Sequence, residues 1–206
     1  TIAQLHKGNV GTILDYSVEG EEEEHVFDAT CEEIIRTILR ADGDVRIPIT
    51  VFKITGIGRF ALLEKLDAKQ ALTETESAEF ERVKARCHKI CKTAYDRGVP
   101  IMIDAEESWI QETIDELALD MMREFNKEKL IVYNTYQMYR HDKLADMKAD
   151  HLIARETGFI LGVKMVRGAY MEKERARAEA MSYPSPIQPN KEASDKDYNA
   201  SVNYCV

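Results

Sequence analysis

Residues 162–175 read GVKMVRGAYMEKER and contain the clearest change of local pattern in the chain. The stretch continues an apolar run that begins at Phe159 and carries one lysine, Lys164, and its composition becomes helical after Tyr170. This order predicts a strand, a tight turn at Gly168 and a helix. Glycine at a strand end lets the backbone approach a ligand closely, and the free N–H groups that open a helix favour an anion such as phosphate. Taken singly, however, Lys164 could pair with a carboxylate in a core, and Gly168 could only end the strand.

The same arrangement, an apolar run that ends in a polar residue, occurs four more times in the chain. Strands are predicted near residues 11–16, 49–55, 99–104, 130–135 and 159–166, and the polar residues of the first four are Asp15, Lys53, Asp104 and Asn134. Four of the five runs are followed by a helical pattern. Alternation of strands and helices implies a parallel sheet with right-handed crossovers, so we expect these polar residues on one rim of the sheet.

Capping residues and glycines predict where the helices begin and end. Helices are expected to start at Thr30 and Ser108, because each is followed three residues later by Glu or Gln. A long helix is expected over residues 73–97, stopped by Gly98. The acidic run at residues 19–24 is predicted to be a solvated loop. Further helical patterns cover residues 58–67, 143–157 and 169–181 and begin again near residue 194.

Composition excludes several classes of protein. The 206 residues suffice for one sizeable core or two small ones, and the net charge of −9 argues against a nucleic-acid surface. No apolar run approaches the ~20 residues of a membrane-spanning helix. The four cysteines lack the spacing of a zinc site, so we expect no metal, and they fit a reducing compartment. There is no signal peptide, so we do not expect secretion, and Thr1 is not expected to be the natural start.

Two folds place a ligand at the carboxyl ends of parallel strands, the (β/α)₈ barrel and the doubly wound open sheet. Inward lysines and an aspartate favour the barrel, because an open sheet buries both faces in apolar contacts. We therefore expect an α/β fold, a TIM-like barrel of which residues 1–206 supply about the first five βα units as one incomplete catalytic domain. The inner face is expected to expose Val51, Met102, Val132 and Val166.

Four strand-end motifs resemble the proline dehydrogenase family in their order and spacing. They are KITG at Lys53, IDAEES at Asp104, YNTYQ at Asn134 and VKMVRGAY at Lys164. The loop YPSPIQPNKEASD at residues 183–195 is similar to the segment that follows in that family. The stretches NTYQMYRHD and VRGAYMEKER are closer to the eukaryotic-type monofunctional enzymes than to the long bifunctional bacterial ones. The resemblance covers nearly the whole chain from Asp15.

The resemblance implies oxidation of L-proline to Δ1-pyrroline-5-carboxylate by hydride transfer to noncovalently bound FAD, with electrons passed to a membrane quinone. It implies that Lys53 pairs with the substrate carboxylate, and it implies catalytic roles for Asp104, Lys164 and Tyr170. Lys164 stands where bacterial enzymes have an arginine, and a lysine keeps the charge but not the planar fork. Contacts to the cofactor are implied for Ala105, Asn134, Lys164, Val166, Arg167, Gly168, Ala169, Lys191 and Ser194.

In that family three more strands follow, and then a helix whose paired arginines grip the proline carboxylate. Five parallel strands would leave two open edges, so we expect a complementary C-terminal barrel chain as a partner. The resemblance places the protein in the cytoplasm or on the mitochondrial matrix side, peripheral to the membrane.

Two other classes of function remain open at this point. An NAD-dependent enzyme on an open α/β sheet is the first, and the short Gly56-Ile57-Gly58 motif argues against it because the third glycine of a dinucleotide fingerprint is missing. An inactive binding module is the second. The presence of both Lys53 and Asp104 argues against this alternative.

Overall fold

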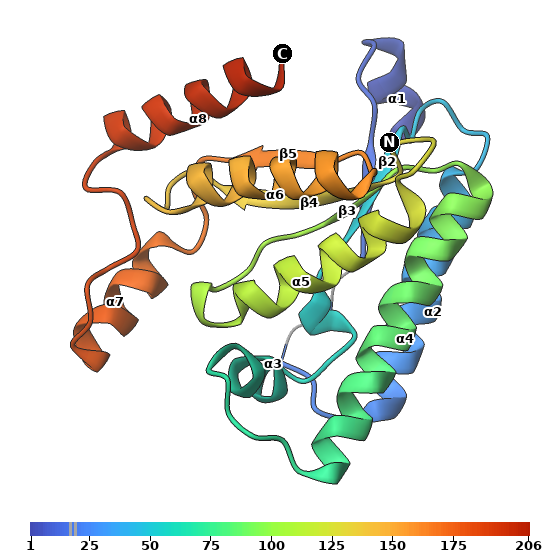
Figure 1. The fold of residues 1–206 in the computed structure, drawn as a ribbon. Coiled ribbons are helices and arrows are strands. Elements are labelled where there is room, and N and C mark those ends of the chain that lie inside the picture. The colour runs from blue at the N-terminus through green and yellow to red at the C-terminus, as the bar shows by residue number, and fades with distance from the viewer. Residues whose placement is uncertain (17, 19) are drawn as a thin grey trace.

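Five parallel strands form one sheet in the order β1-β2-β3-β4-β5, as the computed structural model shows for residues 1–16, 18 and 20–206 (Figure 1). Every neighbouring pair is parallel and consecutive in the chain. The prediction of an α/β fold with a parallel sheet is therefore confirmed. The strands are β1 (Ile13–Asp15), β2 (Ile49–Phe52), β3 (Ile101–Ile103), β4 (Val132–Gln137) and β5 (Val163–Val166).

Helices follow the strands and form a layer outside the sheet. They are α1 (Ile2–Lys7), α2 (Glu24–Ala41), the 3₁₀ turn η1 (Ile54–Gly56), α3 (Phe60–Asp67), α4 (Glu74–Arg97), α5 (Ser108–Phe125), α6 (Lys143–Thr157), α7 (Met171–Met181) and α8 (Lys191–Cys205). Helix α4 has the expected ends: the side chains of Thr73 and Glu76 form a capping box, and Gly98 adopts a left-handed conformation with φ 66°. None of the helices in the described residues has the length and apolar composition that a membrane-spanning helix needs.

One predicted helix start is wrong. Thr30 lies buried inside α2, which begins at Glu24, because the Glu24 carboxylate binds Arg82 and Arg86 of α4 across the helix pair. The predicted acidic loop therefore ends where this helix begins, and its first residue, Glu19, lies outside the described residues.

Helix α5 begins at Ser108 as predicted, but the capping box expected there does not form. The Ser108 hydroxyl donates to Glu174 of α7 instead of capping its own helix, and the side chain of Gln111 accepts a hydrogen bond from the Glu106 N–H. In both cases a contact with a distant segment replaces the local bond that the sequence pattern suggested.

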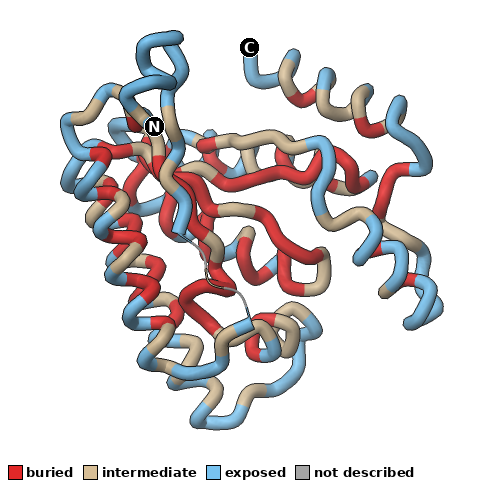
Figure 2. The backbone as a smooth tube through the Cα atoms, turned by 180° about the vertical axis from the view of Figure 1, so that it is seen from behind, coloured by how far each residue is buried: buried red, intermediate tan, exposed pale blue. Residues whose placement is uncertain are grey.

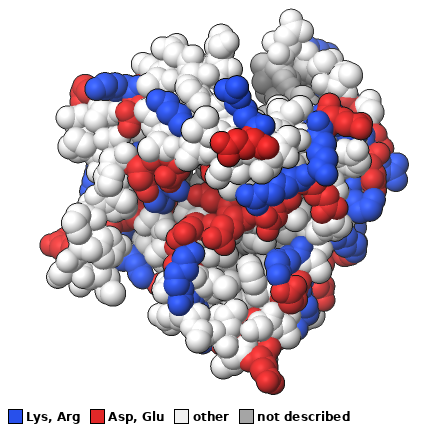
Figure 3. Space-filling view, viewed as in Figure 1, with Lys and Arg blue, Asp and Glu red and all other residues white. Residues whose placement is uncertain are grey.

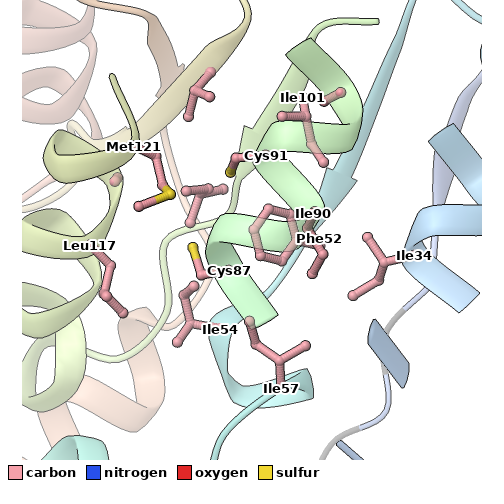
Figure 4. Close-up of a cluster of buried hydrophobic side chains, with 14 of the residues drawn as sticks. Ile34, Phe52, Ile54, Ile57, Cys87, Ile90, Cys91, Ile101, Leu117 and Met121 are labelled. Atoms are coloured by element: carbon pink, nitrogen blue, oxygen red, sulfur yellow. The ribbon is translucent and has the colours of Figure 1, made fainter. Parts of the chain in front are cut away.

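The main apolar core lies between the sheet and helices α2, α4 and α5 (Figures 2 and 4). Figure 4 shows Phe52 of β2 beside Ile90 of α4, with Cys87 and Cys91 on the same face of that helix. Both thiols are fully buried and free. Fully burying an aliphatic or aromatic side chain contributes about 1.5–3 kcal/mol, so this layer holds the sheet in place.

The residues of β4 face the opposite sides of the sheet from those predicted. Val132 is fully buried in the core beneath the helices, whereas we expected it on the inner face. The register places Tyr133 beside Met102 and Val51, so Tyr133 and Thr135 face inward instead. Val51 and Met102 were expected to be exposed on the inner face, but their exposures are only 6% and 8%. Each has a side-chain neighbour on both adjacent strands.

A buried asparagine fixes the start of the last two strands. Asn126 follows α5, and its Nδ2 donates to the carbonyls of Val132 and Ile160 at 2.8 and 2.9 Å. Its Oδ1 accepts from the N–H groups of Ile131 and Val132. Beside it, Gly162 passes so close to β4 that a Cβ atom on it would lie 2.1 Å from the Val132 carbonyl oxygen.

Acidic side chains form a band across the face that α5 and α6 present in Figure 1 (Figure 3). They border a groove of about 430 Å³, in which the buried amine of Lys143 pairs with Asp115 and Asp146. The groove lies between α5 and α6, and its lining includes Ser108, Arg140 and Asp142 from the segments that follow β3 and β4.

Candidate functional site

One row of polar side chains crosses the carboxyl ends of four strands. Val51 pairs with Met102 in register, and Thr135 pairs with Lys164. Side chains two residues apart share a face of a strand, so the next residues along belong to the same row. The row consists of Lys53 and Asp104, which directly follow β2 and β3, and of Thr135 and Lys164, which lie on β4 and β5. The predicted rim therefore exists, and it contains Thr135 in place of Asn134.

An ion pair joins two of these residues across the sheet. Lys164 Nζ bonds Asp104 Oδ1, and the two side chains keep exposures of 26% and 23%. Thr135 lies between their strands; its hydroxyl donates to the Ile103 carbonyl at 2.8 Å and lies 3.5 Å from the same carboxylate oxygen. A half-open pair of this kind holds a cation and an anion at fixed positions without removing either from a ligand's reach.

Tyr170 lies at the N-terminus of α7, beside Lys53. The pKa of the Tyr170 phenol is raised to about 12, mainly by burial and then by the Glu106 carboxylate, while the charge and hydrogen bond of Lys53 oppose the rise. The phenol is therefore neutral at physiological pH and keeps a proton to donate. The structure thus brings together Lys53 and Tyr170, two of the residues to which the sequence gave a role.

Glu106 is a residue of this region that the sequence reasoning missed. It is only 3% exposed, and its carboxylate accepts hydrogen bonds from the N–H and the hydroxyl of Thr55. Burial raises its pKa to about 7, the Thr55 bonds oppose this, Glu107 adds to it and Lys53 lowers it. The only signal in the sequence was the pair Glu106-Glu107, which follows Ala105 in the IDAEES motif.

A cavity of about 270 Å³ opens beside Glu106. Its walls are Gly20, Glu21, Thr55, Phe60, Glu106, Glu107, Tyr170 and Lys173. The cavity connects the loop after β3 with the start of α7, and a neutral phenol and a carboxyl that titrates near neutrality both face it. These groups can bind and orient a small polar molecule.

The turn after β5 meets the start of α8. Arg167 and Lys191 both pair with Asp195, Arg167 at 3.2 Å, and the Arg167 guanidinium lies over the ring of Tyr198. Gly168 and Ala169 between β5 and α7 are exposed, and a Cβ on Gly168 would touch only the Met171 sulfur, at 3.4 Å. Two cations thus flank an open, small-residue turn, which is a suitable surface for an anionic group.

Four other predicted residues occupy different surroundings. Asn134 is fully buried on the helix side, where its Nδ2 donates to Asp115 Oδ1 of α5 at 2.8 Å, so it does not join the row. Ser194 is buried within the first turn of α8 near Asn190. Ala105 is buried next to Asp104, and Val166 is half-buried one step beyond Lys164 on its face. Gln137, which the sequence reasoning missed, ties the two strand ends by donating to the Glu106 carbonyl at 2.6 Å.

Comparison with known proteins gives one consistent family. A family model described as proline dehydrogenase matches residues 1–206. A similar relative is the carbapenem antibiotics biosynthesis protein CarD of Pectobacterium carotovorum, 34% identical over 205 residues, which are 99% of this chain and 53% of that protein. Another is the human protein named proline dehydrogenase 1, mitochondrial, 40% identical over 134 residues, 65% of this chain and 22% of that protein. The chain thus spans about half, or less, of the relatives it matches.

Solved structures of PutA show the fold. That of proline utilization A from Bdellovibrio bacteriovorus, inactivated by N-propargylglycine, superposes with a TM-score of 0.82 at 19% identity over 98% of this chain and 22% of that one. The part that matches is TIM-barrel-like. The likeness confirms the predicted barrel-type fold for these five βα units.

Proposed function

The chain belongs to the proline dehydrogenase family, and on that premise we propose that it carries part of an active site for flavin-dependent oxidation of L-proline to Δ1-pyrroline-5-carboxylate. One observation carries the proposal: the Lys164–Asp104 ion pair lies in the same strand-end row as Lys53. A substrate that is both a carboxylate and an amine needs a fixed cation and a fixed set of polar partners at one place, and this row offers them.

In this proposal Lys53 binds the substrate carboxylate. The lysine stands at the end of β2, beside the neutral phenol of Tyr170, which can donate a second hydrogen bond to the same ligand. Asp104 holds Lys164 at the far side of the row. Binding energy from a partly buried cation such as Lys53 fixes the orientation of a small substrate, which is the main contribution a protein makes when a cofactor supplies the reactivity.

The residues around the row fit FAD. Lys164, Arg167 and Lys191 offer three cations from β5 to the start of α8, and the exposed turn at Gly168 and Ala169 leaves room for close approach. We propose that Ala105, Lys164 and Val166 contact the flavin and that Arg167 to Ala169, Lys191 and Ser194 hold the outer part. The bound cofactor supplies the acceptor for the hydride. Asn134 contributes indirectly, through its bond to Asp115.

The two outer strands of the sheet are available to a partner. Among the described residues, β1 and β5 are the outermost strands of the sheet, each paired on one side only. We propose that a complementary C-terminal barrel segment packs against these edges and completes the proline site. A membrane quinone would accept the electrons. The mitochondrial relatives favour the matrix side of a mitochondrial membrane, with a cytoplasmic location as the alternative.

The experiment is an absorbance spectrum of the purified protein, alone and with the complementary segment, followed by proline-dependent reduction of a quinone analogue. In the protein assembled with that segment we expect flavin absorption that denaturation releases. Colourless protein that reduces NAD with proline would contradict the cofactor, and flavin-loaded protein that leaves proline unoxidised would contradict the substrate.

A further inference from the structure

Helix α7 is attached to the rest of the protein almost entirely by polar contacts. Its two buried residues are Glu174 and Ala178, so no large apolar side chain of this helix is buried. Figure 1 shows α7 at one side of the molecule, away from the sheet. A helix normally docks through an apolar stripe, so its position here must be set by something else.

Glu174 provides the principal attachment. The side chain is 1% exposed, and its two carboxylate oxygens accept from the N–H and the hydroxyl of Ser108 at 2.6 and 2.7 Å. Ser108 is the first residue of α5, and the N-cap residue Glu107 makes no capping bond with its own side chain. Glu174 therefore caps α5 from another helix, satisfying one free N–H group and placing a negative charge at a positive helix end.

Two further charged contacts surround this bond. Lys173 pairs with Glu107, whose carboxylate is nearly buried. The guanidinium of Arg177 pairs with Glu64 at 2.5 Å and lies 4.3 Å from the ring centre of Trp109. The same surface of α7 thus makes consecutive contacts with residues 107 to 109.

The hydrogen bonds between Glu174 and Ser108 join two segments that carry residues of the candidate site. The loop that ends at Ser108 begins with Asp104, whereas Glu174 lies one helical turn after Tyr170 and donates its N–H to the Tyr170 carbonyl at 2.9 Å. Tyr170 faces the cavity beside Glu106 and interacts with Lys53. A shift of α7 along α5 would therefore move Tyr170 and the turn before it relative to Asp104.

We infer that Glu174 is a positioning residue: by capping α5 through its two hydrogen bonds to Ser108, it holds Tyr170 and the turn at residues 167–169 in register with the Asp104 loop. Its effect on catalysis rests on the proposed function. Its effect on the docking of α7 does not.

The chain offers a direct probe of this docking, because Trp109 is its single tryptophan. Glu174→Ala should detach α7 from α5 and raise the acrylamide quenching constant of Trp109 fluorescence by about twofold, as expected for a local opening. Glu174→Gln should stay close to the wild type, since its amide oxygen can accept from the Ser108 N–H and its amide nitrogen can donate to the hydroxyl. Glu179→Ala is the matched control, an exposed glutamate of the same helix.

The catalytic consequence is measured on the flavin-loaded protein with its complementary segment. Glu174→Ala should raise KM for proline about tenfold, with a smaller change in kcat at saturating proline, which is the scale of a misplaced binding group. Glu174→Gln should restore KM. If Glu174→Ala fails to fold, Glu174→Asp serves, since it keeps the charge but cannot span both bonds, and it should raise the quenching constant in the same direction.

The inference is overturned if Glu174→Ala, or Glu174→Asp in its place, matches Glu179→Ala in quenching and in KM. It is also overturned if Glu174→Gln behaves like the alanine variant. Wild-type protein that binds no FAD and oxidises no proline would sink the proposed function, while the quenching measurements would still decide whether Glu174 positions α7.

Discussion

Lys164 and Asp104 form an ion pair across the sheet, although 60 positions separate them in the chain and a whole strand, β4, lies between β3 and β5. Thr135 of that middle strand lies within 3.5 Å of the same carboxylate oxygen. The three side chains belong to one row, so a change at one of them alters the partners of the other two.

A double-mutant cycle measures this coupling. Asp104→Asn and Lys164→Met should each destabilise the protein, and their combined effect should fall short of additivity by about 1 kcal/mol in urea unfolding. The matched control is the surface pair Lys92–Asp96, with side chains about half exposed, for which the coupling should stay below about 0.5 kcal/mol. Additive effects at Asp104 and Lys164 would show that the pair contributes nothing.

Replacement of Lys53 tests substrate binding. Lys53→Ala removes the proposed partner of the proline carboxylate, so kcat/KM should fall. The fall should correspond to a loss of about 2–4 kcal/mol in transition-state stabilisation, the scale for losing one charged partner. The loss should appear mainly in KM, with FAD still bound. Lys127→Ala, an exposed lysine after α5, should leave both constants unchanged; an unchanged kcat/KM in Lys53→Ala refutes the role.

Glu106 should make stability depend on pH. Its pKa rises from 4.5 to about 7 in the folded protein, mainly through burial, so the folded state binds more protons than the unfolded state between these values. Stability from this group is therefore full below pH ~4.5 and is lost as pH rises through ~7. Glu106→Gln should equal the wild type near pH 4.5 and exceed it by about 1–3 kcal/mol at pH 8.

Urea unfolding of both proteins across this range provides the measurement. The control is Glu128→Gln, an exposed glutamate between α5 and β4, which should show no such divergence. Parallel curves for Glu106→Gln and the wild type would mean that the carboxyl titrates normally in the folded state.

Gly162 should tolerate no side chain. A Cβ would lie 2.1 Å from the Val132 carbonyl oxygen and 2.9 Å from the Tyr133 Cα, both backbone atoms that cannot move away singly. Gly162→Ala should cost about 2–4 kcal/mol, since overpacking here also displaces strand pairing. Gly8→Ala, whose nearest neighbour would be the Leu5 carbonyl at 3.4 Å, should change the thermal midpoint little.

The open edges lead to a prediction about assembly. Purified alone, the chain should be aggregated or free of flavin, because the outer sides of β1 and β5 offer backbone groups for pairing with other strands. Co-expression with the complementary segment should restore solubility and proline oxidation. Mass spectrometry and sedimentation decide it: a soluble, flavin-loaded and active species of this chain alone would be the contrary result.

The order of strands and helices could be predicted because each apolar run carries its own signal. The ends of α4 were predictable for the same reason, since Thr73, Glu76 and Gly98 act within a few residues. One helix start and one capping box failed where a distant partner replaced the local one: Glu24 binds arginines of α4, and Ser108 binds Glu174. Capping patterns describe only local competition for a hydrogen bond, so they cannot anticipate such partners.

The candidate site was predictable in part. Strand ends identified Lys53, Asp104 and Lys164, because parallel strands bring their carboxyl ends to one rim. The face of β4 could not be read, because Val132, Tyr133, Asn134 and Thr135 offer plausible side chains for either face, and only the register with β3 decides. Glu106 was missed since a glutamate gives no sign in the sequence that it is buried.

Asn126 makes the register of β4 independent of the length of the loop at residues 127–130. Its side chain binds backbone groups of Ile131, Val132 and Ile160. The starts of β4 and β5 are therefore positioned by the end of α5 and not by the residues of the loop. We therefore expect an insertion within residues 127–130 to leave the rim unchanged. A change at Asn126 itself would free β4 to slip by one residue, and such a slip exchanges the two faces of a strand. Thr135 would then turn toward the helices, and Asn134 would take its place beside the ion pair.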